Sequence, residues 1–126
     1  MTFTTLTTLV IGGHAASRES VIAAALAADS AGNATTALIL EGLPDGISQL
    51  IAEQHQSPLH IVRIAPGCLC CTGNLIMRVT LNRLLRHPPT RLFVSLATAT
   101  HFDHIRLFFT QPPYDALLTL TDDFRM

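Results

Sequence analysis

The chain of 126 residues contains no lysine. All eight of its basic residues are arginines: Arg18, Arg63, Arg78, Arg83, Arg86, Arg91, Arg106 and Arg125. Any mechanism that needs a lysine is therefore excluded, including phosphate binding by the lysine of a Gly-x-x-x-x-Gly-Lys-Ser/Thr loop. The formal net charge is -1 and no basic run occurs, so we expect no nucleic-acid partner and no binding to acidic membranes.

Three further absences concern the cellular compartment. The first residues lack the basic start and long apolar region of a secretory signal. No apolar run approaches the roughly 20 residues that span a bilayer, so we expect no membrane partner. Cysteine is missing everywhere except in one four-residue segment. Clustered thiols without a secretory signal point to a reducing compartment, and we predict a cytoplasmic protein.

The composition and the order of apolar runs predict the fold. The chain is 48% hydrophobic and 13% charged, which is typical of a folded domain with a buried core. At this length we expect one domain that spans residues 1–126. Short aliphatic runs alternate with helical patterns along the chain. This alternation predicts an α/β fold with a mostly parallel sheet of about five strands and helices on both faces.

The expected elements follow from these patterns. The predicted strands are residues 5–11, 35–40, 59–64, 91–96 and 114–120. The predicted helices are residues 17–29, 47–53, 74–86 and 102–109, and residues 41–46 are predicted to form a loop. Ligands of parallel sheets bind at the loops that follow the carboxyl ends of the strands. We therefore expect residues 12–17, 41–46, 66–73 and 97–101 to share one rim.

The three cysteines, Cys68, Cys70 and Cys71, predict a metal site. Thiolates are strong ligands for soft and borderline metal ions. Zinc is the first candidate, although Cu(I) and Co(II) also accept thiolate ligands. The cluster supplies three of the four ligands of a usual structural zinc site, so the remainder must come from elsewhere. An inert thiol cluster and a redox pair, for which disulfide geometry is tight, stay open as alternatives.

The segment Leu59–Leu75, which contains Gly67-Cys68-Leu69-Cys70-Cys71, resembles the Gly-Cys-x-Cys-Cys segment of the CobW-like metallochaperone GTPases. This family is a branch of the P-loop GTPases. Residues 38–47 resemble the family's strand and Asn-Glu-Phe-Gly loop, and residues 8–12 fall where its first strand and P-loop begin. The resemblance spans the chain but only the amino-terminal part of the family's GTPase domain. It implies a P-loop NTPase-like fold, truncated.

The resemblance also implies a function. The family is associated with GTP-dependent handling of zinc, cobalt or other transition metals, and its Cys-x-Cys-Cys motif is linked to metal binding. By this resemblance the metal ligands are Cys68, Cys70, Cys71 and Glu41. A ligand role for His14 is left open, and His60 is predicted to be a packed or edge side chain.

The nucleotide-binding positions depart from the family pattern. In register with the P-loop, the chain reads Gly12-Gly13-His14-Ala15-Ala16-Ser17-Arg18-Glu19-Ser20. Ser17 replaces the last glycine, Arg18 replaces the lysine, and Glu19 replaces the hydroxyl that binds magnesium. A carboxylate at the last of these positions repels triphosphate oxygens. The turn can still hold an anion at the helix N-terminus. The residues that would bind it are Gly12, Gly13, Ser17, Arg18 and Ser20.

The second catalytic element of the family is missing as well. Residues 95–98 read Ser-Leu-Ala-Thr, without the family's acidic residue and glycine, and no Asn-Lys-x-Asp motif follows. We therefore expect a pseudo-GTPase that is not an enzyme and does not use GTP as a cofactor.

Together these features predict a CobW-like pseudo-GTPase domain that binds a transition metal and takes part in metal handling or delivery. Its partner would be a metalloprotein client or a second copy of the chain. Two alternatives remain. One is a divergent metallochaperone that binds and hydrolyses GTP by using Arg18 and Ser20. The other is a non-catalytic protein-interaction module.

Overall fold

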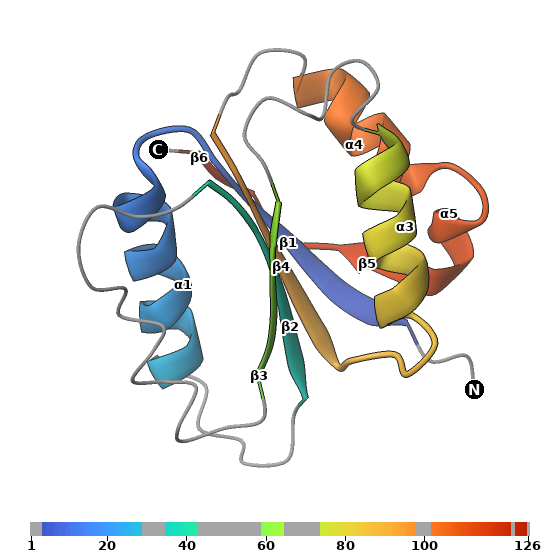
Figure 1. The fold of residues 1–126 in the computed structure, drawn as a ribbon, viewed down its shortest axis with the longest axis horizontal. Coiled ribbons are helices and arrows are strands. Elements are labelled where there is room, and N and C mark those ends of the chain that lie inside the picture. The colour runs from blue at the N-terminus through green and yellow to red at the C-terminus, as the bar shows by residue number, and fades with distance from the viewer. Residues whose placement is uncertain are drawn as a thin grey trace.

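The computed structural model describes residues 4–28, 35–42, 59–64, 74–97, 102–121 and 123–125. Within them, a parallel sheet is flanked by helices (Figure 1). The strands are β1 (Thr5–Ile11), β2 (Thr36–Glu41), β3 (Leu59–Ile64), β4 (Arg91–Leu96), β5 (Leu118–Leu120) and β6 (Phe124–Arg125). The helices are α1 (Ala15–Ala28), α3 (Asn74–Leu84), α4 (Phe102–Thr110) and α5 (Tyr114–Leu117).

The strands lie in the order β3-β2-β4-β1-β5, and β6 also pairs with β1. All the strand pairs found within the described residues are parallel. β4 lies between β1 and β2, with Ser95 beside Val10 and Val94 beside Ile39. The predicted α/β class and mostly parallel sheet are thus confirmed. Because the strands run the same way, the carboxyl ends of β1 to β4 meet at one rim.

Helices cover both faces of the sheet, as expected (Figure 1). On one face, α1 contributes Ile22, Ala23 and Leu26 to an apolar cluster. These side chains pack against residues of the three central strands: Val10, Leu38, Leu40 and Phe93. The alanine-rich sequence of α1 suits this position, because small side chains let a helix approach a sheet closely.

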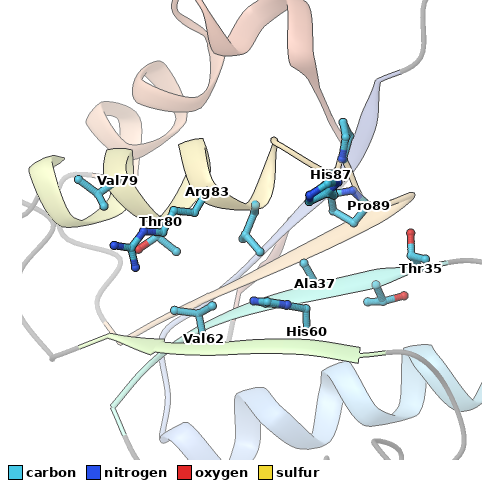
Figure 2. A pocket seen from close by; sticks show the side chains of 12 residues that line it. Thr35, Ala37, His60, Val62, Val79, Thr80, Arg83, His87 and Pro89 are labelled. Carbon is cyan, nitrogen blue, oxygen red and sulfur yellow. The ribbon is translucent and has the colours of Figure 1, made fainter.

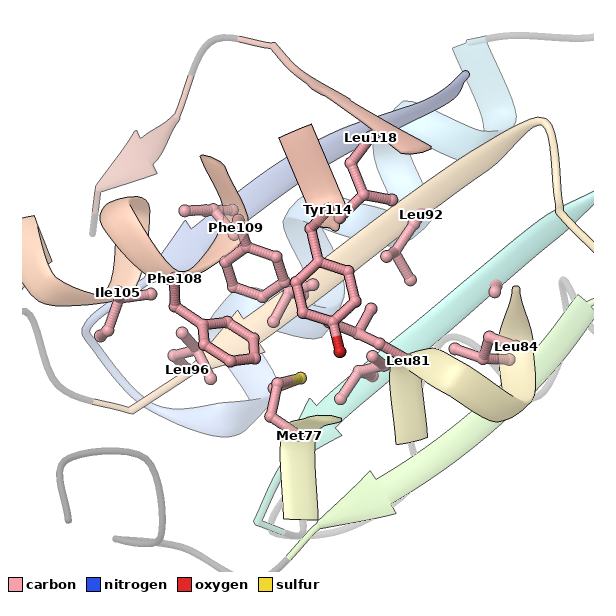
Figure 3. Packing of buried hydrophobic residues seen from close by; sticks show 14 of the residues in the cluster. Met77, Leu81, Leu84, Leu92, Leu96, Ile105, Phe108, Phe109, Tyr114 and Leu118 are labelled. Carbon is pink, nitrogen blue, oxygen red and sulfur yellow. The ribbon is translucent and has the colours of Figure 1, made fainter. Parts of the chain in front are cut away.

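The larger cluster lies on the opposite face, under α3, α4 and α5 (Figure 3). Met77 and Leu81 come from α3, and both are fully buried. The Phe108 ring meets the Phe109 ring edge-on, with centroids 5.3 Å apart, and lies 5.3 Å from the Tyr114 ring. These aromatic contacts position α4 and α5 against the sheet.

The carboxyl-terminal part of the chain differs from the prediction. Residues 114–120, expected to form one strand, divide into the helical turn α5 and the three-residue strand β5. The amide N–H groups of Tyr114 and Asp115 both donate to the Gln111 carbonyl, at 2.8 and 3.1 Å, which starts a helical turn. Asp115 in the first turn also suits the helix dipole. Strand β6 was not predicted, because two residues are too short for a periodic pattern.

Smaller differences concern element ends. The helix expected from residue 17 begins at Ala15, and the helix expected to reach residue 86 ends at Leu84. Glu41, expected in a loop, is the last residue of β2. The predicted helix of residues 47–53 lies outside the described residues. In the part of the chain that the structure describes, no helix is both long and apolar enough to cross a membrane.

Tyr114 reports on the packing of the larger cluster, because it is the one tyrosine of the chain. Its side chain is buried and its hydroxyl donates to Asn82 Oδ1 at 3.0 Å. Burial raises the pKa of the Tyr114 phenol, although the charge of Arg78 acts in the opposite direction. The tyrosinate absorbance of the folded protein should therefore titrate above about pH 10, and near about pH 10 in concentrated urea.

The same shift links stability to pH. The unfolded chain loses the phenol proton first, so the free energy of unfolding should fall as pH rises above about 10. In the Tyr114→Phe variant this contribution to the pH dependence should disappear. Identical titration midpoints in the folded and unfolded states would contradict the described burial of Tyr114.

Candidate functional site

A short glycine turn connects β1 to α1 at the carboxyl rim of the sheet. Gly12 and Gly13 have φ angles of 92° and 62°, a region that favours glycine because it lacks a Cβ atom. The Gly12 N–H donates to the Leu96 carbonyl at 2.9 Å, which ties the turn to β4. The Arg18 N–H donates to the His14 carbonyl at 3.1 Å, as in the first turn of a helix. Three residues thus separate β1 from α1, and Ser17, which the P-loop pattern places in the loop, lies in the helix.

The Arg18 guanidinium is buried at the centre of this rim, with 2% of the residue exposed. Its Nη1 atom donates to the carbonyl oxygens of Gly12 and Gly13, both at 3.0 Å. Its Nη2 atom donates to the Glu41 carbonyl at 3.1 Å, and its Nε atom donates to Ser95 Oγ at 2.7 Å. All three nitrogen atoms of the side chain therefore bond to the protein itself. The side chain joins the glycine turn, the end of β2 and the end of β4.

The charge of Arg18 is balanced within the rim. Burial lowers the pKa of the Arg18 guanidinium, while the carboxylates of Glu41 and Glu19 act in the opposite direction. An arginine with such partners keeps its proton at neutral pH, because its ordinary pKa lies far above that range. The buried cation is therefore stabilised by two carboxylates and by fixed carbonyl dipoles.

Glu19 is a buried carboxylate that pairs with the partly exposed Arg63. It lies on α1, is 1% exposed, and faces Arg63 on β3. Arg63 Nη1 donates to Glu19 Oε2 at 3.1 Å, and Nη2 donates to Oε1 at 3.3 Å. This two-pronged geometry is the strong form of an arginine–carboxylate pair. Arg63 also donates to the Gly42 carbonyl at 3.3 Å. At the position where the P-loop pattern has a magnesium-binding hydroxyl, this chain therefore has a buried, paired carboxylate.

Glu41 ends β2 with a buried side chain. Its Oε1 atom accepts a hydrogen bond of 2.7 Å from the Ala97 amide, just after β4. The next residue, Gly42, has a φ of 81° and donates its N–H to the Ile64 carbonyl at 3.0 Å. Glu41 is also the register partner of Ile64. The end of β2 is thus joined to the ends of both of its neighbouring strands.

The structure brings part of the predicted site together. Gly12, Gly13, Arg18 and Glu41 meet at the rim through the hydrogen bonds above. Ser17 and Ser20 lie in the first turns of α1 and are partly buried, and His14 is exposed. Cys68, Cys70 and Cys71 lie outside the described residues. Among the described residues, three or more His, Cys, Asp or Glu side chains do not gather in a group that could hold a metal ion.

Two partners in this network were not anticipated from the sequence. Ser95 is 1% exposed in a strand whose neighbours are apolar, and such an isolated polar residue indicates a buried hydrogen-bond partner. Arg63 is also a polar residue in a largely apolar strand, β3, although it is exposed there. Both anomalies are visible in the sequence, but neither pattern says which side chain is the partner.

Comparisons with protein-family models, with curated proteins and with solved structures found no match to this chain. The resemblance to the CobW-like proteins therefore rests on the sequence motifs alone.

The Arg18 network leads to a stability prediction. The Arg18→Met variant keeps much of the side-chain length but removes the guanidinium that three backbone carbonyl groups and Ser95 bond to, and it removes a cation near the buried Glu41 and Glu19 carboxylates. Loss of one partner of a buried charge network costs about 3–5 kcal/mol, and we expect a loss of that size in urea unfolding. Arg18→Lys keeps the charge but lacks the planar fork, so its loss should be about 1–3 kcal/mol.

The matched control is Arg86→Met, because Arg86 is exposed just after α3. Its effect on the free energy of unfolding should stay within about 0.5 kcal/mol. Equal losses for Arg18→Met and Arg86→Met would show that the buried network does not stabilise the fold.

Proposed function

We propose that this chain is a CobW-like pseudo-GTPase domain that binds a transition-metal ion through Cys68, Cys70 and Cys71. In this proposal it acts in metal handling or delivery and does not hydrolyse GTP. Zinc is the default metal because thiolate-rich sites suit it, and Co(II) or another transition metal is the alternative. A metal with an incomplete protein shell exchanges more readily than one in a closed structural site, which favours transfer to a client protein.

The bonding of Arg18 is the observation that supports the loss of nucleotide chemistry most strongly. A phosphate-binding residue must offer N–H donors to the ligand. Arg18 instead directs Nε, Nη1 and Nη2 at the protein's own oxygen atoms. To reach a phosphate at the glycine turn, the guanidinium would have to break these bonds and leave a buried network in which Glu41 and Glu19 stabilise its charge.

The charges at the rim support the same conclusion. Arg18 and Arg63 contribute two positive charges, and Glu19 and Glu41 contribute two negative charges. These four charges cancel, so the group has no excess positive charge to attract a triphosphate. Glu19 would in addition repel the triphosphate oxygens. The divergent-GTPase alternative is therefore not favoured.

The position of Glu41 supports its proposed role beside the cysteines. The chain enters the segment that contains the cysteines directly after Ile64, the register partner of Glu41. The Glu41 carboxylate accepts a hydrogen bond from the Ala97 amide at the carboxyl rim, and carboxylate oxygens are zinc ligands in proteins. Three thiolates and one carboxylate form a donor set that zinc accepts. We propose that Glu41 completes the shell when no client residue does so.

Metal content after anaerobic purification tests this proposal. We expect about one zinc ion per chain in the wild type and a large loss in the triple variant Cys68→Ser/Cys70→Ser/Cys71→Ser. Added Co(II) should give the wild type a sulfur-to-cobalt charge-transfer band that is missing in the triple variant. Equal, substoichiometric metal in both proteins would refute the metal-binding function.

Glu41→Gln is the matched variant for the fourth ligand. The amide oxygen of glutamine still accepts the Ala97 hydrogen bond, and the residue-41 carbonyl still accepts from Arg18, while the negative charge near Arg18 is lost. Circular dichroism therefore has to show that the variant is folded before its metal affinity is compared. We expect zinc affinity to fall by about tenfold, measured by competition with a chelator. Unchanged affinity would remove Glu41 from the ligand set and leave the cysteine proposal intact.

A further inference from the structure

A pocket of about 820 Å³ lies between α3 and the β2–β3 side of the sheet (Figure 2). Its apolar lining includes Ala37, Val62 and Leu84, and its polar lining includes His60, Arg83 and His87. Figure 2 shows Arg83 extending from α3 toward β3, and His60 and Val62 extending from β3 toward α3. A volume of this order is typical of small-molecule sites.

The pocket is separate from the carboxyl rim. It is lined by Thr36, the first residue of β2, and by Pro89, which precedes β4. These residues lie at the amino ends of the strands, whereas Glu41 lies at the carboxyl end of β2. A six-residue strand places the two ends about 16 Å apart. The proposed metal function therefore does not account for the pocket.

Hydrogen bonds to backbone carbonyl groups hold one wall of the pocket in place. The Thr5 hydroxyl donates to the Pro89 carbonyl at 2.7 Å. The Thr90 and Arg91 amides both donate to the Thr35 carbonyl, at 2.9 and 3.1 Å. These bonds attach the proline segment to the starts of β1 and β2, so this wall does not have to form when a ligand binds.

The charged lining residues that the structure describes have one sign. Among the described residues, the pocket is lined by one arginine and two histidines and by no aspartate or glutamate. Within the described part of the chain, Arg83 makes no ion pair and no side-chain hydrogen bond. A guanidinium binds a carboxylate through two parallel N–H donors, and either ring form of histidine offers an N–H donor. The apolar lining favours a ligand with a hydrocarbon body.

We propose that this pocket binds a small organic carboxylate, with the carboxylate group on Arg83 and the apolar body against Val62 and Leu84. His60 and His87 act as additional donors from the sheet and from the segment after α3. Inorganic phosphate has the charge but not the apolar body, so it should bind more weakly than the carboxylate.

The test uses 4-fluorobenzoate as the probe and the full chain, with binding followed by fluorine NMR. We expect saturable binding, and at least about tenfold weaker binding of the neutral analogue 4-fluorobenzamide. Inorganic phosphate should displace the probe poorly. Absence of saturable binding, or equal binding of the acid and the amide, would overturn the proposal.

Variants locate the site. Arg83→Gln should weaken 4-fluorobenzoate binding by about tenfold or more, because it removes the charged donor. Arg86→Gln, which alters an exposed arginine that does not line the pocket, should change it less than about twofold. Val79→Trp places a large side chain on the pocket wall and should abolish binding. Circular dichroism confirms that each variant is folded, and equal effects of Arg83→Gln and Arg86→Gln would contradict the assignment.

Discussion

The buried guanidinium of Arg18 is the interaction on which the rim of this sheet depends. It joins two glycine carbonyls, the carbonyl at the end of β2 and the Ser95 hydroxyl of β4. An unpaired charge in such a position would be strongly destabilising, so the carboxylates of Glu19 and Glu41 are part of the same constraint. The charges at the rim consequently balance one another. The side chain at the lysine position of the P-loop pattern, Arg18, bonds the glycine turn to the ends of β2 and β4.

The CobW-like resemblance implies two functions, nucleotide binding and metal binding. The bonding of Arg18 bears on the first and not on the second. Phosphate binding by a P-loop needs a side-chain cation with free donors at the glycine turn, and Arg18 does not supply it because its three side-chain nitrogens bond to the protein. The proposed metal binding depends instead on the thiolates of Cys68, Cys70 and Cys71, with Glu41 as the proposed fourth ligand. Loss of the first chemistry therefore does not require loss of the second. The proposal of a pseudo-GTPase in metal handling follows from this separation.

The sequence predicted the fold well because that fold depends on local patterns. β1, β3 and β4 have the predicted bounds, since short runs rich in aliphatic and β-branched residues, bounded by glycine or proline nearby, leave few alternatives. The prediction of a single strand over residues 114–120 was wrong, because a helical turn that buries Tyr114 overrides the strand propensity of the neighbouring residues. The sequence also indicated that Arg18 occupies the lysine position. It did not indicate the partners of Arg18, because Ser95 and Glu41 come near it only when β4 and β2 lie side by side.

The most direct measurement is the NMR signal of the Arg18 Nε–H group, assigned by its loss in Arg18→Lys. A donor bonded to a buried serine hydroxyl should exchange slowly with water. It should also keep its chemical shift when magnesium-GTP is added at millimolar concentration. Rapid exchange with water, or a shift that saturates with magnesium-GTP, would show that the guanidinium is available to phosphate and would contradict the account.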